Sequence, residues 1–208
     1  MNCISSFRPF KYHNGQYEKN QIAAWETWHE AFDTIIYFND PEPRLSSDYT
    51  LFIPSEPFPR IHQMAEFASY QKDWSCIINA DICVGHTIHN AMRSLKTVRA
   101  KAACSWRFEF DPAVGLWPNS IVDPGMDWFA ATPDVWAIIA QIAPDTIRIG
   151  FQRWDSWMLC ALNTICPKQF YAVTRHRFIF HPKHGDRKYG GGVDRLDEMN
   201  GATWPMDI

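Results

Sequence analysis

The chain has 208 residues, of which 46% are hydrophobic and 21% are charged, and its formal net charge at pH 7 is −3. This length suits one compact domain, the composition excludes a disordered chain, and the charge argues against a strongly basic nucleic-acid binder. No run of 18 consecutive apolar residues occurs, and residues 1–8 lack the pattern of a secretory signal. We therefore expect a cytoplasmic protein without a membrane span.

Short apolar strands alternate with amphipathic helices in the first 80 residues. The expected elements, in chain order, are a strand over 2–7, a helix over 17–32, strands over 34–38 and 51–54, a helix over 60–70 and a strand over 75–78. Uninterrupted apolar strands that alternate with helices are typical of a parallel sheet buried on both faces. The sequence thus predicts an α/β fold, with a mostly parallel central sheet and helices on both faces.

The second half of the chain is less regular. Here we expect a helix over 86–97, strands over 100–110 and 128–132, a helix over 134–141, a strand over 146–149, a helix over 155–163, and strands over 170–174 and 178–180. Pro133 suits the first turn of its helix. Glycine and charge dominate from residue 185, so we expect a domain over 1–184 and a flexible tail over 185–208, with a substrate-ordered lid as the functional alternative.

The cysteines and aromatic residues have structural and functional interpretations. None of the six cysteines belongs to a Cys-x-x-Cys pair and most lie in apolar runs, which favours buried reduced thiols over disulfides or a zinc site. Aromatic residues make up 15% of the chain. They predict either a large aromatic core or a surface on which a sugar or base stacks.

Polar residues that follow the predicted strands are the first candidates for a site, because ligands bind at the carboxyl ends of parallel strands. Asn79 and Asp81 lie two residues apart after an apolar strand, so both side chains can face one ligand. A carboxylate beside an amide suits a hard divalent cation. The alternative for Asp81 is a helix N-cap.

Four phrases occur in a particular order along the chain. They are Gln21-Ile-Ala-Ala-Trp-Glu-Thr-Trp, Asn79-Ala-Asp-Ile, Asp127-Trp-Phe and Ile149-Gly-x-x-x-Trp-Asp-x-Trp. In that order they resemble the GT-A type glycosyltransferases, the nucleotide-diphospho-sugar transferases, over most of residues 2–184. The resemblance implies a Rossmann-like GT-A domain that moves a sugar from a nucleoside-diphosphate donor, commonly a UDP-sugar, to a hydroxyl acceptor with the help of Mn²⁺ or Mg²⁺.

The resemblance also implies a nucleotide-binding set. Ser5, Ser6 and Arg8 match the loop after the first strand that wraps the nucleotide. Asn39 or Asp40 matches the polar residue after the second strand that contacts the base or ribose.

A metal set is implied in the same way. The segment Asn79-Ala80-Asp81 matches the family's Asp-x-Asp motif, whose last acid holds the metal that bridges the donor's pyrophosphate. The first acid of the motif is replaced by Asn79, which also counts among the nucleotide-binding candidates. His181 and His184 match a late histidine that contacts the metal or the pyrophosphate, and imidazole suits Mn²⁺ better than Mg²⁺. A solvent-exposed basic turn is the alternative for both histidines.

Two acids are the implied catalytic residues. Asp127 matches an acidic position near the donor sugar or the acceptor, and Asp155 resembles the base of many inverting members. Arg60, read from the residues alone, precedes a helix whose N-terminus favours anions, so it is either a phosphate contact or a solvated surface residue.

Two other functions are compatible with the same sequence. A nucleotidyltransferase on a similar sheet favours a glycine-rich phosphate loop, whereas the loop 8–15 has only one glycine. A non-catalytic module that binds nucleotide sugars is the second alternative, because Asn79 departs from the motif. The acceptor stays open among a saccharide, a protein, a small molecule and a nucleobase.

Overall fold

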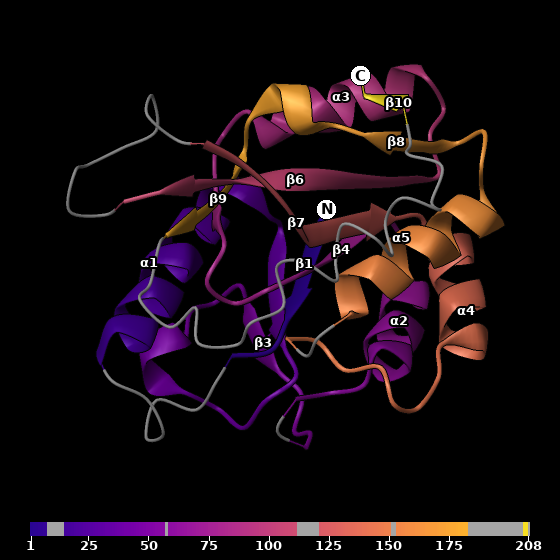
Figure 1. Cartoon of the computed structure of the whole chain (residues 1–208). Coiled ribbons are helices and arrows are strands. Elements are labelled where there is room, and N and C mark those ends of the chain that lie inside the picture. The colour runs from indigo at the N-terminus through magenta and orange to yellow at the C-terminus, as the bar shows by residue number, and fades with distance from the viewer. Residues whose placement is uncertain (8–14, 57, 112–120, 151–152, 183–205, 208) are drawn as a thin grey trace.

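A curled sheet runs through the centre of the protein, with its strands in the order β10-β8-β6-β7-β4-β1-β2-β3 (Figure 1). The computed structural model describes residues 1–7, 15–56, 58–111, 121–150, 153–182 and 206–207. The strands are β1 (Asn2–Ser5), β2 (Thr34–Tyr37), β3 (Thr50–Phe52), β4 (Ser75–Ile78), β5 (Cys83–Val84), β6 (Ala102–Phe110), β7 (Ile121–Ala131), β8 (Phe170–Ala172), β9 (Ile179–Pro182) and β10 (Met206–Asp207).

Most neighbouring strands are parallel, and one long strand interrupts this pattern. β1 pairs in parallel with both β2 and β4, and β2 with β3. β7 lies antiparallel between β4 and β6. The second half of β6 pairs in parallel with β9, which in turn pairs antiparallel with β5, so these two short strands extend the same sheet beside the far end of β6. The carboxyl ends of β1, β2 and β4 therefore face the point where β7 enters the sheet.

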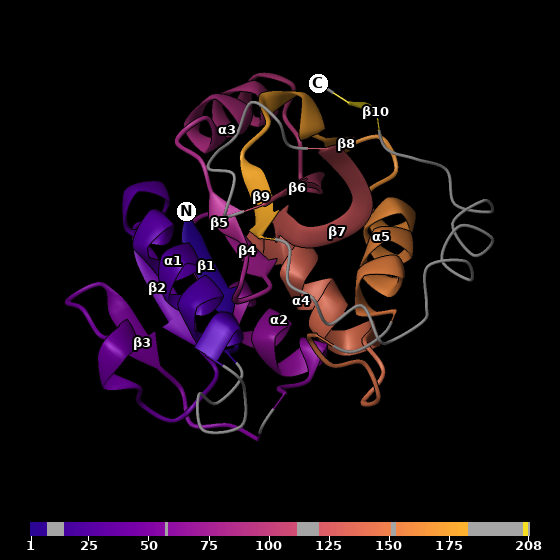
Figure 2. The ribbon, with the colours of Figure 1, turned by 60° about the vertical axis from the view of Figure 1, so that its left-hand side comes forward.

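Helices cover both faces of the sheet. Figure 2 shows α1 (Gly15–Ala31) and α3 (Ile88–Thr97) on one side, and α2 (Ile61–Ser69), α4 (Pro133–Ile142) and α5 (Trp154–Ile165) on the other. Successive strand residues point to opposite faces. Accordingly Cys3 and Cys76 belong to the core under α1 and α3, whereas Ile4 and Ile77 belong to the core under α2, α4 and α5.

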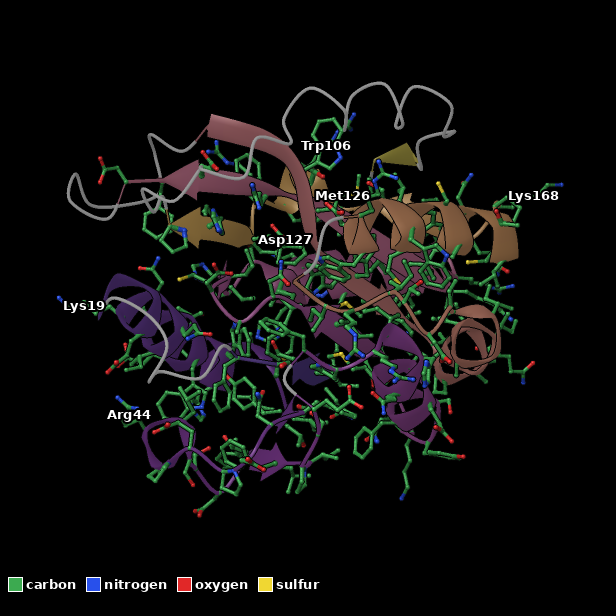
Figure 3. The ribbon with its side chains drawn as sticks, turned by 60° about the horizontal axis from the view of Figure 1, so that its bottom comes forward. Lys19, Arg44, Trp106, Met126, Asp127 and Lys168 are labelled. Carbon is green, nitrogen blue, oxygen red and sulfur yellow. The ribbon has the colours of Figure 1, made fainter. Side chains whose placement is uncertain are left out.

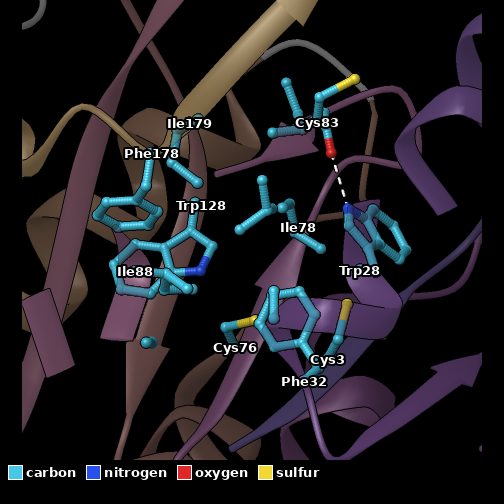
Figure 4. Close-up of a cluster of buried hydrophobic side chains, with 14 of the residues drawn as sticks. Cys3, Trp28, Phe32, Cys76, Ile78, Cys83, Ile88, Trp128, Phe178 and Ile179 are labelled. Carbon is cyan, nitrogen blue, oxygen red and sulfur yellow. Dashed lines mark hydrogen bonds between the residues drawn. The ribbon is translucent and has the colours of Figure 1, made fainter. Parts of the chain in front are cut away.

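The core under α1 and α3 is strongly aromatic. Trp28, Trp128 and Phe178 are fully buried in it (Figure 4). The ring of Phe178 lies edge-on to Trp128, with centroids 5.0 Å apart. The indole N–H of Trp28 donates to the main-chain oxygen of Ile82 over 2.7 Å, so this aromatic residue also fixes the turn after β4. Much of the high aromatic content thus serves packing, as one of the two interpretations predicted.

The predicted α/β architecture with a mostly parallel sheet is confirmed. The strand expected over 146–149 is wrong, because only Arg148 forms an isolated bridge, to Arg60. The strand expected over 128–132 is the end of the much longer β7. In the predicted tail, Met206–Asp207 pair with β8, whereas residues 185–205 lie outside the described residues.

The six cysteines are all free, and only Cys160 is exposed, so the prediction of buried reduced thiols holds for the other five. Within the described ranges, no helix combines the length and the apolar character that crossing a bilayer requires.

Candidate functional site

The candidate site lies where β4 ends beside β7. Trp128 of β7 pairs with Ile78, the last residue of β4, so the preceding residue Asp127 lies level with Asn79. The main-chain N–H of Asn79 donates to the carbonyl of Asp127 over 3.2 Å. Figure 3 shows Asp127 and Met126 in the interior of the molecule, where β7 curls. The antiparallel direction of β7 is what delivers an acid to the carboxyl edge of the parallel strands.

Asp127 connects three neighbouring strands through its side chain. Its Oδ1 accepts a hydrogen bond from Nδ2 of Asn79 on the β4 side, and its Oδ2 accepts one from Nη1 of Arg107 on β6, each over 2.5 Å. Nη2 of Arg107 lies 3.7 Å from Oε1 of Glu109. The side chains of Arg107, Glu109 and Asp127 are only 17%, 9% and 7% exposed. Charged groups this buried require partners of opposite charge, and Arg107 and the two acids provide partners for one another.

His181 joins the two ends of this cluster. Its Nε2 lies 3.5 Å from Oδ2 of Asp81, and its Nδ1 lies 3.9 Å from Oε1 of Glu109. Burial lowers the pKa of His181, but the hydrogen bond and the charge of Asp81 outweigh it, so the net pKa lies above the ordinary value of 6.5. Asp81 and His181, predicted from distant parts of the sequence, are therefore brought together.

The residues at this edge fit a divalent cation in part. A carboxylate oxygen and an imidazole nitrogen that face each other form a donor pair suited to Mn²⁺. In the part of the chain that the structure describes, no group of three or more His, Cys, Asp or Glu side chains is arranged to hold a metal ion. The predicted ligand His184 lies outside the described residues. Asp81 and His181 are thus the two residues that would hold a cation here.

The predicted nucleotide-binding residues are arranged around the end of β1. Ser5 is buried and its hydroxyl donates to the carbonyl of Ile78 over 2.6 Å, while Ser6 is half-buried. Asn39 is buried, and its side-chain amide makes two hydrogen bonds to the main chain of Phe7. Its Oδ1 accepts from the Phe7 N–H over 2.8 Å, and its Nδ2 donates to the Phe7 carbonyl over 3.0 Å. The amide of Asn39 therefore fixes the chain at the end of β1.

The other nucleotide-binding candidates have different surroundings. Asp40 directly follows Asn39 and is exposed, so it is accessible to a ligand. Arg8 lies outside the described residues. Arg60 immediately precedes α2, as predicted, but its guanidinium lies 3.6 Å from Asp145 and 3.9 Å from Glu56, so two carboxylates already compensate its charge.

Asp155 lies in the first turn of α5 and is buried, with 6% exposure. Its Oδ1 accepts a hydrogen bond from the N–H of Ser156 over 2.9 Å. The preceding Trp154 contacts Phe129 of β7, with ring centroids 5.6 Å apart. The start of α5 is therefore fixed two residues along β7 from Asp127, and a carboxylate at a helix N-terminus is stabilised as an anion.

Arg107 and Glu109 were not among the residues predicted from the sequence. The signal that could have found them is their spacing, since two charged residues two apart in an otherwise apolar strand point to the same side. A basic and an acidic residue in that pattern indicate a buried pair rather than a solvated face.

Two cavities lie outside this charged cluster. One, of about 330 Å³, is bordered by the end of α1 and by one side of α3, and includes Trp74 and Arg93 in its lining. The other, of about 320 Å³, lies between α2 and the ends of β2 and β3, with Phe38 and Phe67 in its lining. Neither cavity is lined by Asp81, and we place the site at the cluster because that is where the ionisable groups converge.

Comparison with known proteins defines the fold but not a family. No known family profile matches the sequence, and no curated protein matches it either. A Bacillus anthracis protein assigned as a glucose-1-phosphate thymidylyltransferase, solved in complex with a sucrose, has a similar structure: TM-score 0.51 and 12% identity over 83% of this chain and 85% of that chain. Staphylococcus aureus TarS, residues 1–349, gives a TM-score of 0.55 and 8% identity over 87% of this chain and 60% of that chain. The chain therefore shares the sheet and helix arrangement of these proteins.

Proposed function

We propose that the protein is a glycosyltransferase that moves a sugar from a nucleoside diphosphate, with UDP as the expected nucleotide, to a hydroxyl acceptor. The observation that carries this proposal is the pairing of Asp81 with His181 over 3.5 Å at the carboxyl edge of the parallel strands. Ligands bind at that edge in sheets of this type. The fold shared with a thymidylyltransferase-like protein is consistent with a nucleotide at this edge.

The chain's own residues can bind and orient a donor there. The exposed carboxylate of Asp40 and the half-buried hydroxyl of Ser6 lie after β2 and β1, where the base and ribose are expected. Without a bound cation, imidazolium at His181 would place positive charge beside the leaving diphosphate, and positive charge at that point lowers the barrier to its departure.

A divalent cation bound between Asp81 and neutral imidazole at His181 would supply this charge stabilisation in place of imidazolium. Within the described residues these two side chains would hold it. Metal dependence is thus part of the proposal, and a titration with Mn²⁺ and Mg²⁺ followed by chelation is its direct measurement.

Asp155 is the proposed base for the acceptor hydroxyl. Its carboxylate belongs to the first turn of α5, a rigid element anchored on β7 by Trp154. A general base contributes about 10²- to 10⁴-fold to the rate. We expect Asp155→Asn to lower kcat in that range while leaving donor affinity within about threefold of the original, since the amide keeps the shape of the side chain.

The chain offers a matched control for this variant. Asp134 occupies the same position in the first turn of α4, but it is exposed and bonded to Lys101 on the surface. Asp134→Asn should leave transfer unchanged. Undiminished transfer by Asp155→Asn would remove this carboxylate from the mechanism.

The product identifies the class of reaction. With a panel of nucleotide sugars, a glycosyltransferase releases a nucleoside diphosphate, whereas a nucleotidyltransferase given a nucleoside triphosphate and a sugar phosphate releases pyrophosphate. The nucleotidyltransferase is the second candidate because the similar structure from B. anthracis is assigned to that class. Release of pyrophosphate alone would replace the proposed function by this one, and donor binding without either product would indicate a non-catalytic module.

A further inference from the structure

The amide of Asn79 has only one orientation that its neighbours allow. A carboxylate accepts hydrogen bonds and donates none, so the group that faces Oδ1 of Asp127 over 2.5 Å must be the NH₂ of Asn79. The amide oxygen of Asn79 is then the group that does not bond to Asp127. No described residue donates to this oxygen, and Asn79 is half-buried rather than enclosed.

The orientation of Asp127 is fixed in turn by Arg107. Nη1 of Arg107 holds the second oxygen of Asp127 over 2.5 Å, so both carboxylate oxygens have a donor. Gly125 makes room for the guanidinium, because a Cβ at this position would lie 2.7 Å from Cζ of Arg107. Gly125, Arg107, Asp127 and Asn79 thus form a continuous series of contacts that ends at the amide oxygen.

We infer that this series positions Asn79 so that its amide oxygen faces the bound diphosphate and its cation, as a neutral replacement for the first acid of the Asp-x-Asp motif. Amide carbonyls are suitable ligands for hard cations. Asn79 is the binding residue, and Asp127 and Arg107 are positioning residues that act through it. This inference rests on the proposed function, since it assumes a nucleotide at the carboxyl edge of β4.

The motif and the contacts of Asn79 predict opposite effects of Asn79→Asp. Judged by the motif, Asn79→Asp restores the first acid and should strengthen metal and donor binding. Judged by the contacts, it places a carboxylate 2.5 Å from the carboxylate of Asp127, with no proton between them. Two partly buried anions at that distance repel each other, and one of them must turn away or bind a proton.

The test is a double-mutant cycle on positions 79 and 127, with binding of UDP in the presence of Mn²⁺ measured by calorimetry. A hydrogen bond to a charged group corresponds to about tenfold or more in affinity, so we expect Asn79→Asp and Asp127→Asn each to weaken binding by about that factor. Asn79→Asp combined with Asp127→Asn exchanges acid and amide and restores the hydrogen bond. We expect the combined variant to bind within about threefold of the original protein.

A second readout separates positioning from simple stability. Thermal unfolding of all four proteins reports whether each one folds, and binding is compared only at temperatures where each is folded. In Arg107→Lys, which keeps a cation for Asp127 but loses the planar fork, binding should fall less than in Arg107→Met, whereas a loss of packing alone predicts the reverse.

The possible outcomes are distinguishable. Tighter binding by Asn79→Asp than by the original protein overturns the inference, as does a combined variant no better than the weaker single variant. Binding of no nucleoside diphosphate by the original protein overturns the proposed function, and this inference with it. Recovery in the combined variant together with loss in both single variants supports the series of contacts.

Discussion

Replacing Gly125 by alanine tests the buried charge cluster without removing any polar atom. A Cβ at this position would lie 2.7 Å from Cζ, 2.8 Å from Nε and 3.1 Å from Nη1 of Arg107. Non-bonded heavy atoms in contact keep about 3.5 Å, so the guanidinium must retreat by about 0.8 Å. Gly125 is not among the glycines with positive φ, so the backbone accepts alanine and the contact alone opposes it.

The retreat of the guanidinium loosens its 2.5 Å hydrogen bond to Asp127. A hydrogen bond between charged groups contributes about 1.5–3 kcal/mol, while alanine in place of glycine in a strand adds roughly 0.5–1 kcal/mol of stability. We therefore expect Gly125→Ala to lower the free energy of unfolding by about 1–2 kcal/mol. For a chain of this size that corresponds to a Tm lower by roughly 2–8 °C.

Thermal unfolding followed by circular dichroism measures this difference. Gly85→Ala is the matched control, because its Cβ would meet the nearest atom, Cε2 of Phe180, at 3.4 Å and needs little movement. In an Arg107→Ala background the same Gly125→Ala change should lose this cost, because alanine has no atom at the point of contact. A Gly125→Ala protein that unfolds at the original temperature would refute the reasoning.

Three further predictions concern single side chains. The raised pKa of His181 means that its charged form stabilises the fold. This contribution is complete below the ordinary pKa of 6.5 and disappears as the pH rises through the folded pKa. The free energies of unfolding of the original protein and of His181→Gln, measured in urea, should therefore converge at higher pH. Trp28→Phe leaves a buried carbonyl without its 2.7 Å hydrogen bond and should lower the unfolding free energy by about 1–3 kcal/mol in urea titrations. Under native conditions a thiol reagent should modify only the exposed Cys160, and Cys160→Ser should abolish the reaction, because burial raises the pKa of thiols such as Cys83, here to about 12.

The sequence predicted the strands and helices around β1 to β4 well, because each buried strand is one apolar run and each helix has one apolar face. The family resemblance also implied Asp81 and His181 as metal residues, and the fold brings them together. The sequence did not predict that Asn79 and Asp81 have different partners. β4 ends at Ile78, so strand alternation no longer governs the two residues, and each turns to a different neighbour.

Arg107 shows why the rest of the site was harder to predict. Alternation along β6 should place residues of opposite parity on opposite faces, yet Ala103 and Phe108 belong to the same core. The register shift between Ser105 and Arg107 accounts for this, because one extra residue exchanges the faces of the strand. Such an irregularity depends on the partner strand β7 and leaves no periodic signal in the sequence of β6.

The close approach of Gly125 to Arg107 also constrains how this protein changes over evolutionary time. A side chain at 125 that arrives before residue 107 becomes shorter would displace the guanidinium that compensates the buried carboxylate of Asp127. Among natural variants we expect arginine at 107 to occur with glycine at 125, and an acid at 127 to occur with an amide at 79. Substitutions at these four positions should therefore occur together, even where the surrounding surface residues vary independently.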